Sequence, residues 1–321
     1  MKHLGISGGG TKIVGLFAAA EVIIREKNYK PDIISGISAG AILSVPLAMR
    51  MWDKMHAMLN DLKLDAFFNV LPVKPDGGFR PCHTIKQIVT GKHYLGEQRN
   101  LEESLSKVIT QVDFTNYKTD STFAACVVGA VDFLHGERVY INLKQVSYEN
   151  FLSIVNASAS LPVFTPGIEH APINDFEGVR RPKEGDRLML FDGGVRDHAP
   201  TLRMLESTQW NITETCTLFS RPETNEILKP SAKDNTFPKN ILEVLNKFVD
   251  ITNTEISKDD ERLEKDFLFA HPNIIDHGRY FLPAIMNGVY DADPSRLKQL
   301  FNAGQLNTRK DWDTHHTKTN T

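Results

Sequence analysis

A serine stands at the centre of residues 36–40, which read Gly-Ile-Ser-Ala-Gly. The apolar residues 31–35 predict a buried strand before this segment, and residues 41–58 predict a helix after it that kinks or restarts at Pro46. A serine on a sharp turn between strand and helix projects its hydroxyl clear of the backbone, and the helix N-terminus favours negative charge beside it. We therefore predict Ser38 as the nucleophile of an acyl transfer. The small residues that permit the turn are Gly36, Ala39 and Gly40.

A serine hydroxyl is a weak nucleophile until a base accepts its proton, and an aspartate can be that base. Asp192 directly follows a predicted strand at 187–191 and precedes Gly193 and Gly194. Because the carboxyl ends of parallel strands meet at one edge of a sheet, we expect this carboxylate to reach Ser38. The non-catalytic alternatives are a turn-forming aspartate and a helix-capping serine.

A run of three glycines, Gly8, Gly9 and Gly10, follows the predicted first strand at residues 2–7. Acyl transfer needs backbone N–H groups aimed at the oxyanion, and a glycine run can expose them. A plain tight turn is the alternative. A glycine-rich loop after a strand can also hold phosphate, which leaves nucleotide binding open at this point.

The elements that carry these residues predict an α/β fold. A strand, an apolar helix at residues 13–27, the strand at 31–35 and the helix at 41–58 imply parallel strands with right-handed crossovers. Further strands are predicted at 122–132, 138–143, 187–191 and 215–220, and further helices at 147–160, 240–253 and 296–303. We expect one domain over residues 1–308 and a polar, disordered tail over 309–321.

Composition limits the classes of function. The chain has 321 residues, a net charge of −3 and no global basic field, which excludes a nucleic-acid partner while leaving a local basic patch for membranes open. Its three cysteines contain no CxxC pair, so neither a disulfide framework nor a zinc site is expected. Glycines interrupt the N-terminal apolar run and no stretch reaches about 18 apolar residues, which predicts a cytoplasmic protein.

Taken together, the motifs resemble the patatin-like phospholipase family. The resemblance rests on residues 8–12 (Gly-Gly-Gly-Thr-Lys), 36–40, 157–162 (Ala-Ser-Ala-Ser-Leu-Pro) and 192–195 (Asp-Gly-Gly-Val), in the family's order and spacing. It covers roughly residues 3 to 205. It implies a three-layer α/β/α domain with a mostly parallel central sheet.

The resemblance also implies a mechanism. Ser38 and Asp192 would form a catalytic dyad without a histidine, the three glycines would form the oxyanion hole, and Lys12 would take the place of the basic residue that follows them. The implied substrates are phospholipids or other lipid esters, with peripheral contact to a membrane surface. No metal and no cofactor are implied.

Three residues depart from the family pattern: Ser7 stands where some members have Asp, Ile13 where many have Gly, and His198 where relatives carry a smaller polar residue. A Ser–His–Asp triad through His198 is the alternative to the dyad. We expect a structural or solvated histidine instead, because it follows a predicted surface turn.

Two rival functions use the same residues. An actin-like kinase would bind phosphate on the glycine run, but Ser7 replaces the aspartate that holds magnesium, and the lysine spacing does not fit a P-loop. The second rival is a catalytically silent scaffold on the same fold.

Other segments carry weaker expectations. Loops at 69–81 and 165–186 are expected to border the site, and the second loop could meet anionic headgroups through Arg180, Arg181 and Lys183. The apolar residues after Ser38 are expected to border an acyl chain: Ile42, Leu43, Val45 and Leu47. Methionines 49, 51, 55 and 58 are expected in the core, with an acyl pocket as the alternative. The acidic run 259–261 is expected on a solvated face.

Overall fold

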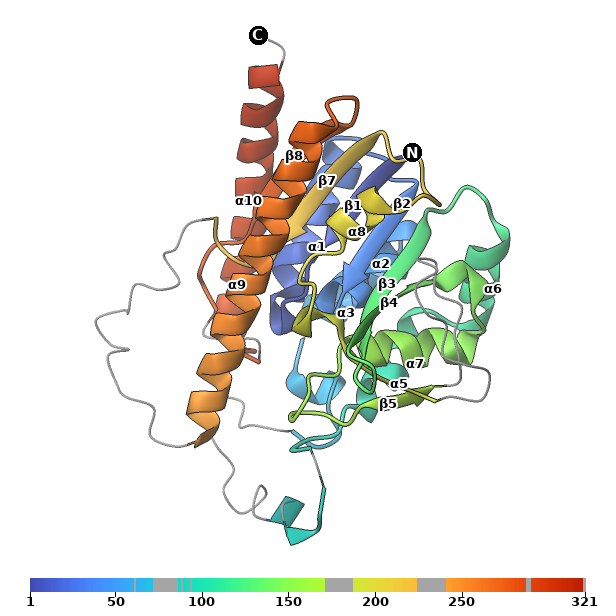
Figure 1. Cartoon of the computed structure of the whole chain (residues 1–321), viewed down its shortest axis with the longest axis vertical. Helices are drawn as coiled ribbons and strands as arrows, with labels where there is room; N and C mark the ends of the chain where they lie inside the picture. Colours follow the sequence, from blue (N-terminus) through green and yellow to red (C-terminus); the bar gives the residue numbers. More distant parts are fainter. Residues whose placement is uncertain are drawn as a thin grey trace, which may run out of the picture.

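The chain forms an α/β fold around one eight-stranded sheet of order β5-β6-β3-β2-β1-β7-β8, with β4 paired to β3 (Figure 1). This computed structural model describes residues 1–60, 62–71, 86–87, 89–92, 94–170, 187–223, 241–286 and 290–319. Strands β3, β2, β1, β7 and β8 are parallel to one another, as predicted. The strands are β1 (Lys2–Ile6), β2 (Ile33–Ile37), β3 (Ala125–Asp132), β4 (Glu137–Asn142), β5 (Ile168–His170), β6 (Leu188–Asp192), β7 (Glu214–Phe219) and β8 (Ile275–Phe281).

The centre of the sheet is buried on both faces, which is why β1 and β2 read as near-continuous apolar runs. His3 is the polar exception in β1. Its ring is completely buried and lies 2.7 Å from the Ser35 hydroxyl of β2 and 3.1 Å from the Thr215 hydroxyl of β7. Burial lowers the pKa of His3 to about 3, so a neutral imidazole links the three central strands.

Strand β3 is longer than its neighbour β2 and changes partner along its length. Its first half pairs in parallel with β2, ending at the pair Ile37 and Gly129. Its second half pairs antiparallel with β6, beginning at the pair Ala130 and Asp192. The end of β2 and the end of β6 therefore meet at adjacent residues of β3. This meeting point positions the site described below.

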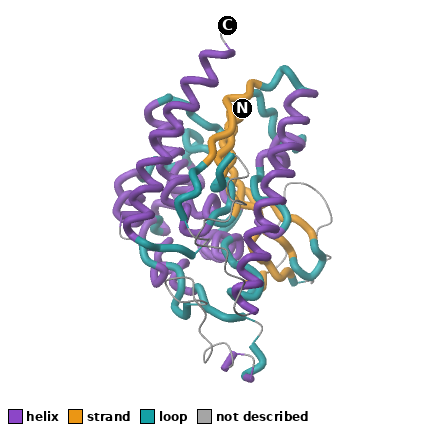
Figure 2. The backbone as a smooth tube through the Cα atoms, turned by 90° about the vertical axis from the view of Figure 1, so that its left-hand side faces the viewer, coloured by secondary structure: helices purple, strands orange, loops and turns teal. Residues whose placement is uncertain are grey.

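Helices cover both faces of the sheet and complete the predicted three layers (Figures 1 and 2). One hydrophobic cluster joins the sheet to α1, α2, α7 and α10, and a second joins the opposite face to α8 and α9. The described helices of more than five residues are α1 (Ile13–Glu21), α2 (Ala39–Ala48), α3 (Trp52–Asn60), α5 (Arg99–Val108), α6 (Gln111–Thr119), α7 (Tyr148–Ser158), α8 (Thr201–Glu206), α9 (Ile241–Ala270) and α10 (Pro294–Thr319).

The helix predicted at residues 41–58 does break, but beyond Pro46, where the kink or restart was expected. Pro46 lies inside α2, and the helix continues for two further residues before the chain turns at Arg50, whose φ is 55°. The Met51 N–H donates to the Pro46 carbonyl at 2.9 Å, and α3 begins one residue later. The single predicted helix is therefore two helices.

The prediction of a disordered tail over 309–321 is wrong for residues 309–319, which form the last turns of α10. Trp312 is buried there between the aromatic rings of Tyr29, Tyr280 and two histidines. Arg309 forms a two-bond ion pair with Glu26, at 2.6 and 2.7 Å. Trp312 packs the end of this helix against β8, and Leu297 and Leu300 bury its first turns in the core.

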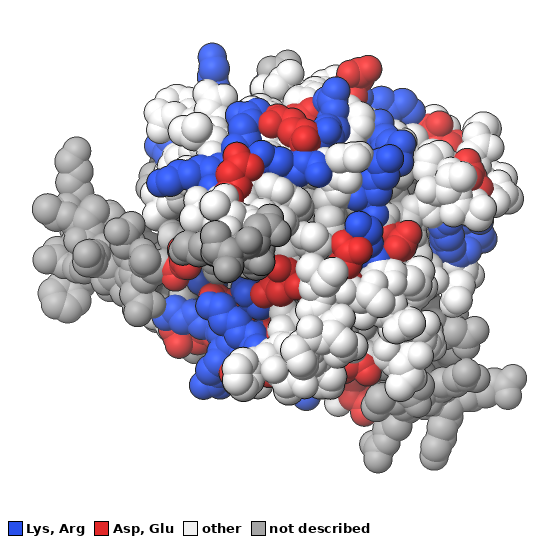
Figure 3. Space-filling view, turned by 90° about the horizontal axis from the view of Figure 1, so that it is seen from above, with Lys and Arg blue, Asp and Glu red and all other residues white. Residues whose placement is uncertain are grey.

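The end of the sheet at which β1 begins carries a mixed surface, with Lys and Arg interleaved with Asp and Glu (Figure 3). Lys2 pairs with Glu214 at 2.9 Å and Lys27 with Asp313 at 2.5 Å near this end. No helix among the described residues is both long and apolar enough to span a bilayer.

Candidate active site

Ser38 occupies the turn between β2 and α2 with φ 55° and ψ −116°, a conformation that non-glycine residues rarely adopt. The turn needs its flanking glycines for room. A Cβ on Gly36 would lie 2.2 Å from the backbone of Gly40, and a Cβ on Gly40 would lie 2.2 Å from the carbonyl oxygen of Ile6. The predicted strained elbow is therefore present, and it is packed tightly against β1.

Two further serines brace this elbow. The Ser38 N–H donates to the Ser158 hydroxyl at 3.0 Å, and that hydroxyl donates to the Gly129 carbonyl at 2.7 Å. The Ser160 carbonyl accepts the Asp192 N–H at 2.8 Å. Both serines belong to the 157–162 motif quoted above, but no pattern in that motif assigns them a role. They connect the turn of Ser38 to the end of β6.

Asp192 lies at that end of β6, only 3% exposed, and lines the same cavity as Ser38, whose side chain is close enough to lower the pKa of the Asp192 carboxyl group. Its Oδ1 also accepts the Gly194 N–H at 2.8 Å. Burial raises the pKa of Asp192 to about 7, while the bond from Gly194 and the Ser38 side chain lower it. A carboxylate with a pKa near neutrality, beside a serine side chain in the same cavity, has the properties of a general base.

The three predicted oxyanion donors are not equivalent. The Gly8 N–H is already donated to the His198 carbonyl at 3.1 Å. Gly9 and Gly10 form the start of a short turn that the Lys12 N–H closes on the Gly9 carbonyl at 3.1 Å. Within the described ranges, their own N–H groups have no acceptor, and both glycines line the same cavity as Ser38. The available amides are those of Gly9 and Gly10.

Ser220, at the end of β7, holds the glycine loop from the other side. Its N–H donates to the Ser7 hydroxyl at 2.8 Å, and its hydroxyl donates to the Gly8 carbonyl. A Cβ on Gly9 would lie 2.6 Å from the Ser220 Cβ, so the loop needs glycine there. Ser7 therefore serves as a structural partner at the position where some family members have Asp.

The cavity in front of Ser38 is mostly apolar. Ile42 is the only predicted acyl-contact residue of α2 that lines it, because Leu43, Val45 and Leu47 face the core. The methionines of α2 and α3 also pack in or against the core, as expected, and do not line the cavity. Its apolar wall, which the sequence did not reveal, comprises Leu64, Phe67, Phe68, Leu101, Ala159, Leu161 and the ring of Tyr290.

His198 was expected to be structural or solvated, and the solvated alternative is wrong. The side chain is 7% exposed and lines the cavity together with Ser38 and Asp192. Burial lowers the pKa of His198 to about 3, with smaller contributions from the charges of Lys12 and Arg221. The ring is therefore neutral, and the Ser38 side chain lowers the pKa of Asp192, which places the nucleophile next to that carboxyl group.

Some residues for which the sequence made a prediction lie outside the described residues. They are the basic residues Arg180, Arg181 and Lys183, and most of the loops at 69–81 and 165–186. Cys82, one of the three cysteines, also lies outside them. Cys126 and Cys216 are buried free thiols. No cluster of three or more potential metal ligands occurs in the part of the chain that the structure describes.

A sequence model of the patatin-like phospholipases matches residues 4–205, which is more than half of the chain and includes every motif above. The chain belongs to the patatin-like phospholipase family. No curated protein matches it.

Two solved structures have a similar arrangement of elements. VipD from Legionella pneumophila aligns with a TM-score of 0.49 and 13% identity, over 98% of this chain and 67% of VipD. ExoU from Pseudomonas aeruginosa, solved in complex with SpcU, aligns with a TM-score of 0.35 and 12% identity, over 85% of this chain and 52% of ExoU. This chain spans about half the length of ExoU.

Proposed function

We propose that the protein is a lipid acyl hydrolase of the phospholipase A or lysophospholipase type. The observation that carries this proposal is the strained Ser38 elbow, which shares a cavity with a buried carboxyl group, Asp192, whose pKa is raised to about 7. Family membership and the mostly apolar cavity support a fatty acyl ester as substrate. Peripheral contact with a membrane and a cytoplasmic location stay predictions.

In the acylation step, Asp192 accepts the Ser38 proton while Oγ attacks the ester carbonyl. The new negative charge develops on the former carbonyl oxygen, within reach of the Gly9 and Gly10 N–H groups. Donors fixed in advance of the reaction stabilise this charge without reorganisation. The intermediate collapses by breaking the bond to the alkoxide, which takes the proton back from Asp192 and leaves Ser38 acylated.

In the deacylation step, water replaces the alcohol. Asp192 accepts a proton from water, the hydroxide attacks the acyl-serine, and the same donors hold the second oxyanion. The fatty acid leaves and the proton returns to Ser38. The apolar wall of Leu64, Phe67 and Phe68 would hold the acyl chain, since burial of each methylene contributes about 0.8 kcal/mol.

The test is incubation of wild type and Ser38→Ala with a mixed phospholipid preparation, with products read by mass spectrometry. We expect free fatty acid and lysophospholipid from wild type alone. Ser44→Ala is the matched control, because Ser44 is a buried serine of α2 that donates to the Ala41 carbonyl at 2.9 Å and does not line the cavity.

Labelling by a fluorophosphonate probe separates this proposal from the scaffold and kinase alternatives. A reactive Ser38 is labelled, whereas a silent scaffold is not. Folded wild-type protein that is neither labelled nor hydrolytic would refute the proposal. Phosphoryl transfer from ATP without ester hydrolysis would instead favour the kinase.

A further inference from the structure

The His198 ring is a buried polar group that the dyad mechanism leaves without a task. Its Nδ1 is buried and has no hydrogen-bond partner among the described residues. Its Nε2 lies on the cavity side, 3.8 Å from the position that a Cβ on Gly8 would take, and the Ser38 Cβ lies 3.2 Å from the same position. The ring therefore stands beside the nucleophile and the glycine loop at once.

The backbone of His198 is held from two sides. Asp260 of α9 accepts the His198 N–H at 2.6 Å and the Ala199 N–H at 2.9 Å on one carboxylate oxygen. The His198 carbonyl in turn accepts the Gly8 N–H. Asp260 is 8% exposed, so the expectation that residues 259–261 form a solvated face is wrong at this residue. The position of the ring is therefore fixed relative to the glycine loop.

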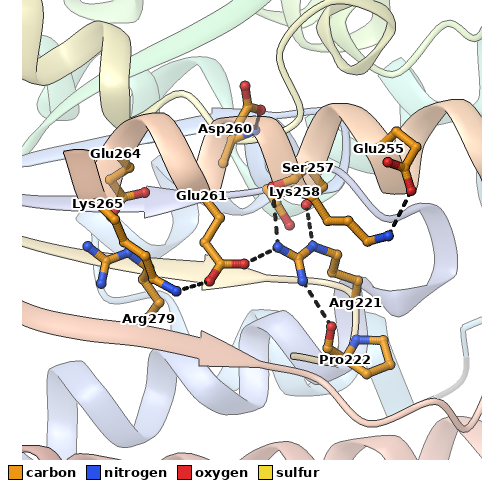
Figure 4. Close-up of polar contacts among 12 residues, drawn as sticks. Arg221, Pro222, Glu255, Ser257, Lys258, Asp260, Glu261, Glu264, Lys265 and Arg279 are labelled. Carbon is orange, nitrogen blue, oxygen red and sulfur yellow. Dashed lines mark hydrogen bonds and ion pairs between the residues drawn. The ribbon is translucent and has the colours of Figure 1, made fainter. Parts of the chain in front are cut away.

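Helix α9 is itself anchored to the end of β7, as Figure 4 shows. The Arg221 guanidinium donates to the Ser257 hydroxyl at 2.8 Å and to the Glu261 carboxylate. Asp260 projects from α9 away from these contacts. Arg221 follows Ser220, which bonds the Gly8 carbonyl, so the same segment fastens both α9 and the glycine loop.

The charge and tautomer of the ring follow from its surroundings. Burial keeps the ring neutral, and the cations of Lys12 and Arg221 oppose its protonation further. A neutral imidazole carries one N–H. An orphaned buried N–H is rarer in proteins than an orphaned acceptor, so the partnerless Nδ1 is the lone-pair nitrogen and Nε2 carries the hydrogen.

We propose that His198 donates its Nε2–H to the oxyanion, as a side-chain member of the oxyanion hole beside Gly9 and Gly10. This inference rests on the proposed acyl hydrolase function. It explains why the Gly8 amide is committed elsewhere: that amide fixes the residue whose ring supplies the donor. His198 neither gains nor loses a proton in either step, and Asp192 carries the proton throughout.

The kinetic test compares three variants on a soluble acyl ester. His198→Ala removes the donor, and kcat is expected to fall about 10²- to 10³-fold with KM changed less than about threefold. His198→Gln keeps an N–H near the Nε2 position, and most of the loss is expected to be recovered. His271→Gln is the matched control, because His271 is exposed and does not line the cavity, and it should stay within about threefold of wild type.

Two kinetic outcomes overturn the inference. Wild-type kcat in folded His198→Ala shows that the ring makes no bond in the transition state. Loss of activity in both variants to the level of Ser38→Ala shows that His198 is the base of a triad. In either case wild type remains active, so the proposed function stands. Wild type that neither hydrolyses esters nor reacts with fluorophosphonate refutes both proposals.

A spectroscopic test is independent of turnover. ¹⁵N NMR of the histidine rings, with His198 assigned by its absence in His198→Gln, is expected to show a neutral Nε2–H tautomer from pH 5 to 8. The Nε2 proton should move downfield when Ser38 is phosphonylated, since the phosphonyl oxygen stands in for the oxyanion. An Nδ1–H tautomer, or a ring that titrates near pH 6.5, overturns the inference.

Discussion

The region matched by the family, residues 4–205, and the region after it contribute to the site in different ways. The first region supplies the reacting groups, on turns that end short strands: Ser38 after β2, Asp192 at the end of β6 and the glycines after β1. The second region supplies no reacting group in the mechanism above. It fixes the position of the first, through Ser220 on Gly8 and Asp260 on His198.

The physical difference lies in where the interactions originate. The elbow depends on close backbone packing at Gly36 and Gly40, where a Cβ would meet the backbone of Gly40 or of Ile6. The supports depend on contacts between residues 60 or more apart in the chain, such as Asp260 with His198. The chemistry is therefore encoded locally, and its geometry is encoded by the packing of α9 and β7. Variants in the two regions should therefore affect catalysis in different ways.

The largest effect is expected from Asp192→Asn, in the region that supplies the reacting groups. The amide cannot accept the Ser38 proton, so kcat is expected to fall about 10³-fold or more. For wild type, kcat should rise with pH through about pH 7, because only ionised Asp192 is a base and its pKa is raised to about 7. A pH–rate profile without a limb near pH 7 would contradict the assignment of Asp192.

The same variant is expected to stabilise the protein, and the sign follows from the raised pKa. The buried Asp192 carboxyl group stabilises the fold only while it is protonated, because burial disfavours its ionised form. Its contribution to the free energy of unfolding is therefore fully present below its unfolded pKa of 3.8 and is lost as pH rises towards 7. Asn at this position cannot ionise, so Asp192→Asn does not lose stability as pH rises. Its gain in unfolding free energy should grow from pH 4 to pH 8 by up to about 4 kcal/mol. Denaturant titrations at both pH values measure it, and an equal gain at both would contradict the prediction.

The two regions also differ in how far the sequence predicted them. The elbow and the end of the strand before Asp192 were predicted, because both depend on short-range patterns. The reason given for their meeting was wrong: β6 is antiparallel to β3, and Asp192 reaches Ser38 because β3 exchanges β2 for β6 at Gly129 and Ala130. A change of partner within one strand is a tertiary feature that periodicity does not report.

The region after residue 205 was predicted only in part, and the reason is physical. Helices α9 and α10 are much longer than the helices predicted at residues 240–253 and 296–303, and strand β8 was not predicted. A polar segment does not indicate that it packs against the protein, or which element it packs against. Asp260 and His198 both looked exposed by residue type. Asp260 is buried because it accepts the main-chain N–H groups of His198 and Ala199, a contact that a sequence read residue by residue cannot show.

An intermediate effect is expected from Asp260→Ala, in the region that positions the reacting groups. Two buried N–H groups lose their acceptor, at about 1–3 kcal/mol each, and the glycine loop loses part of its support. We expect kcat to fall about 10- to 100-fold with little change in KM, and hydrogen exchange at Gly8 and Ala199 to accelerate. Asp260→Asn should recover most of the activity, because its amide oxygen can accept both bonds.

Asp259→Asn is the matched control for this position, since Asp259 lies on the same helix, is exposed and pairs only with Arg262 at 3.1 Å. It should match wild type in both kcat and exchange. If Asp260→Ala leaves the exchange of Gly8 unchanged, then α9 does not support the glycine loop, and the contrast between the two regions no longer holds.

The smallest effect is expected from Tyr290, the one described residue after position 205 that lines the cavity. Its ring contacts Phe68 and Phe164, with centroids 5.6 and 5.7 Å away, and burial together with the charge of Asp192 raises its pKa. Tyr290→Ala removes apolar wall and should raise KM for a long-chain ester about three- to tenfold, with kcat nearly unchanged. Tyr290→Phe should keep both parameters near wild type. A fall in kcat for Tyr290→Phe would instead make the hydroxyl a participant beside Asp192, and the later region would then contribute to the chemistry as well as to its geometry.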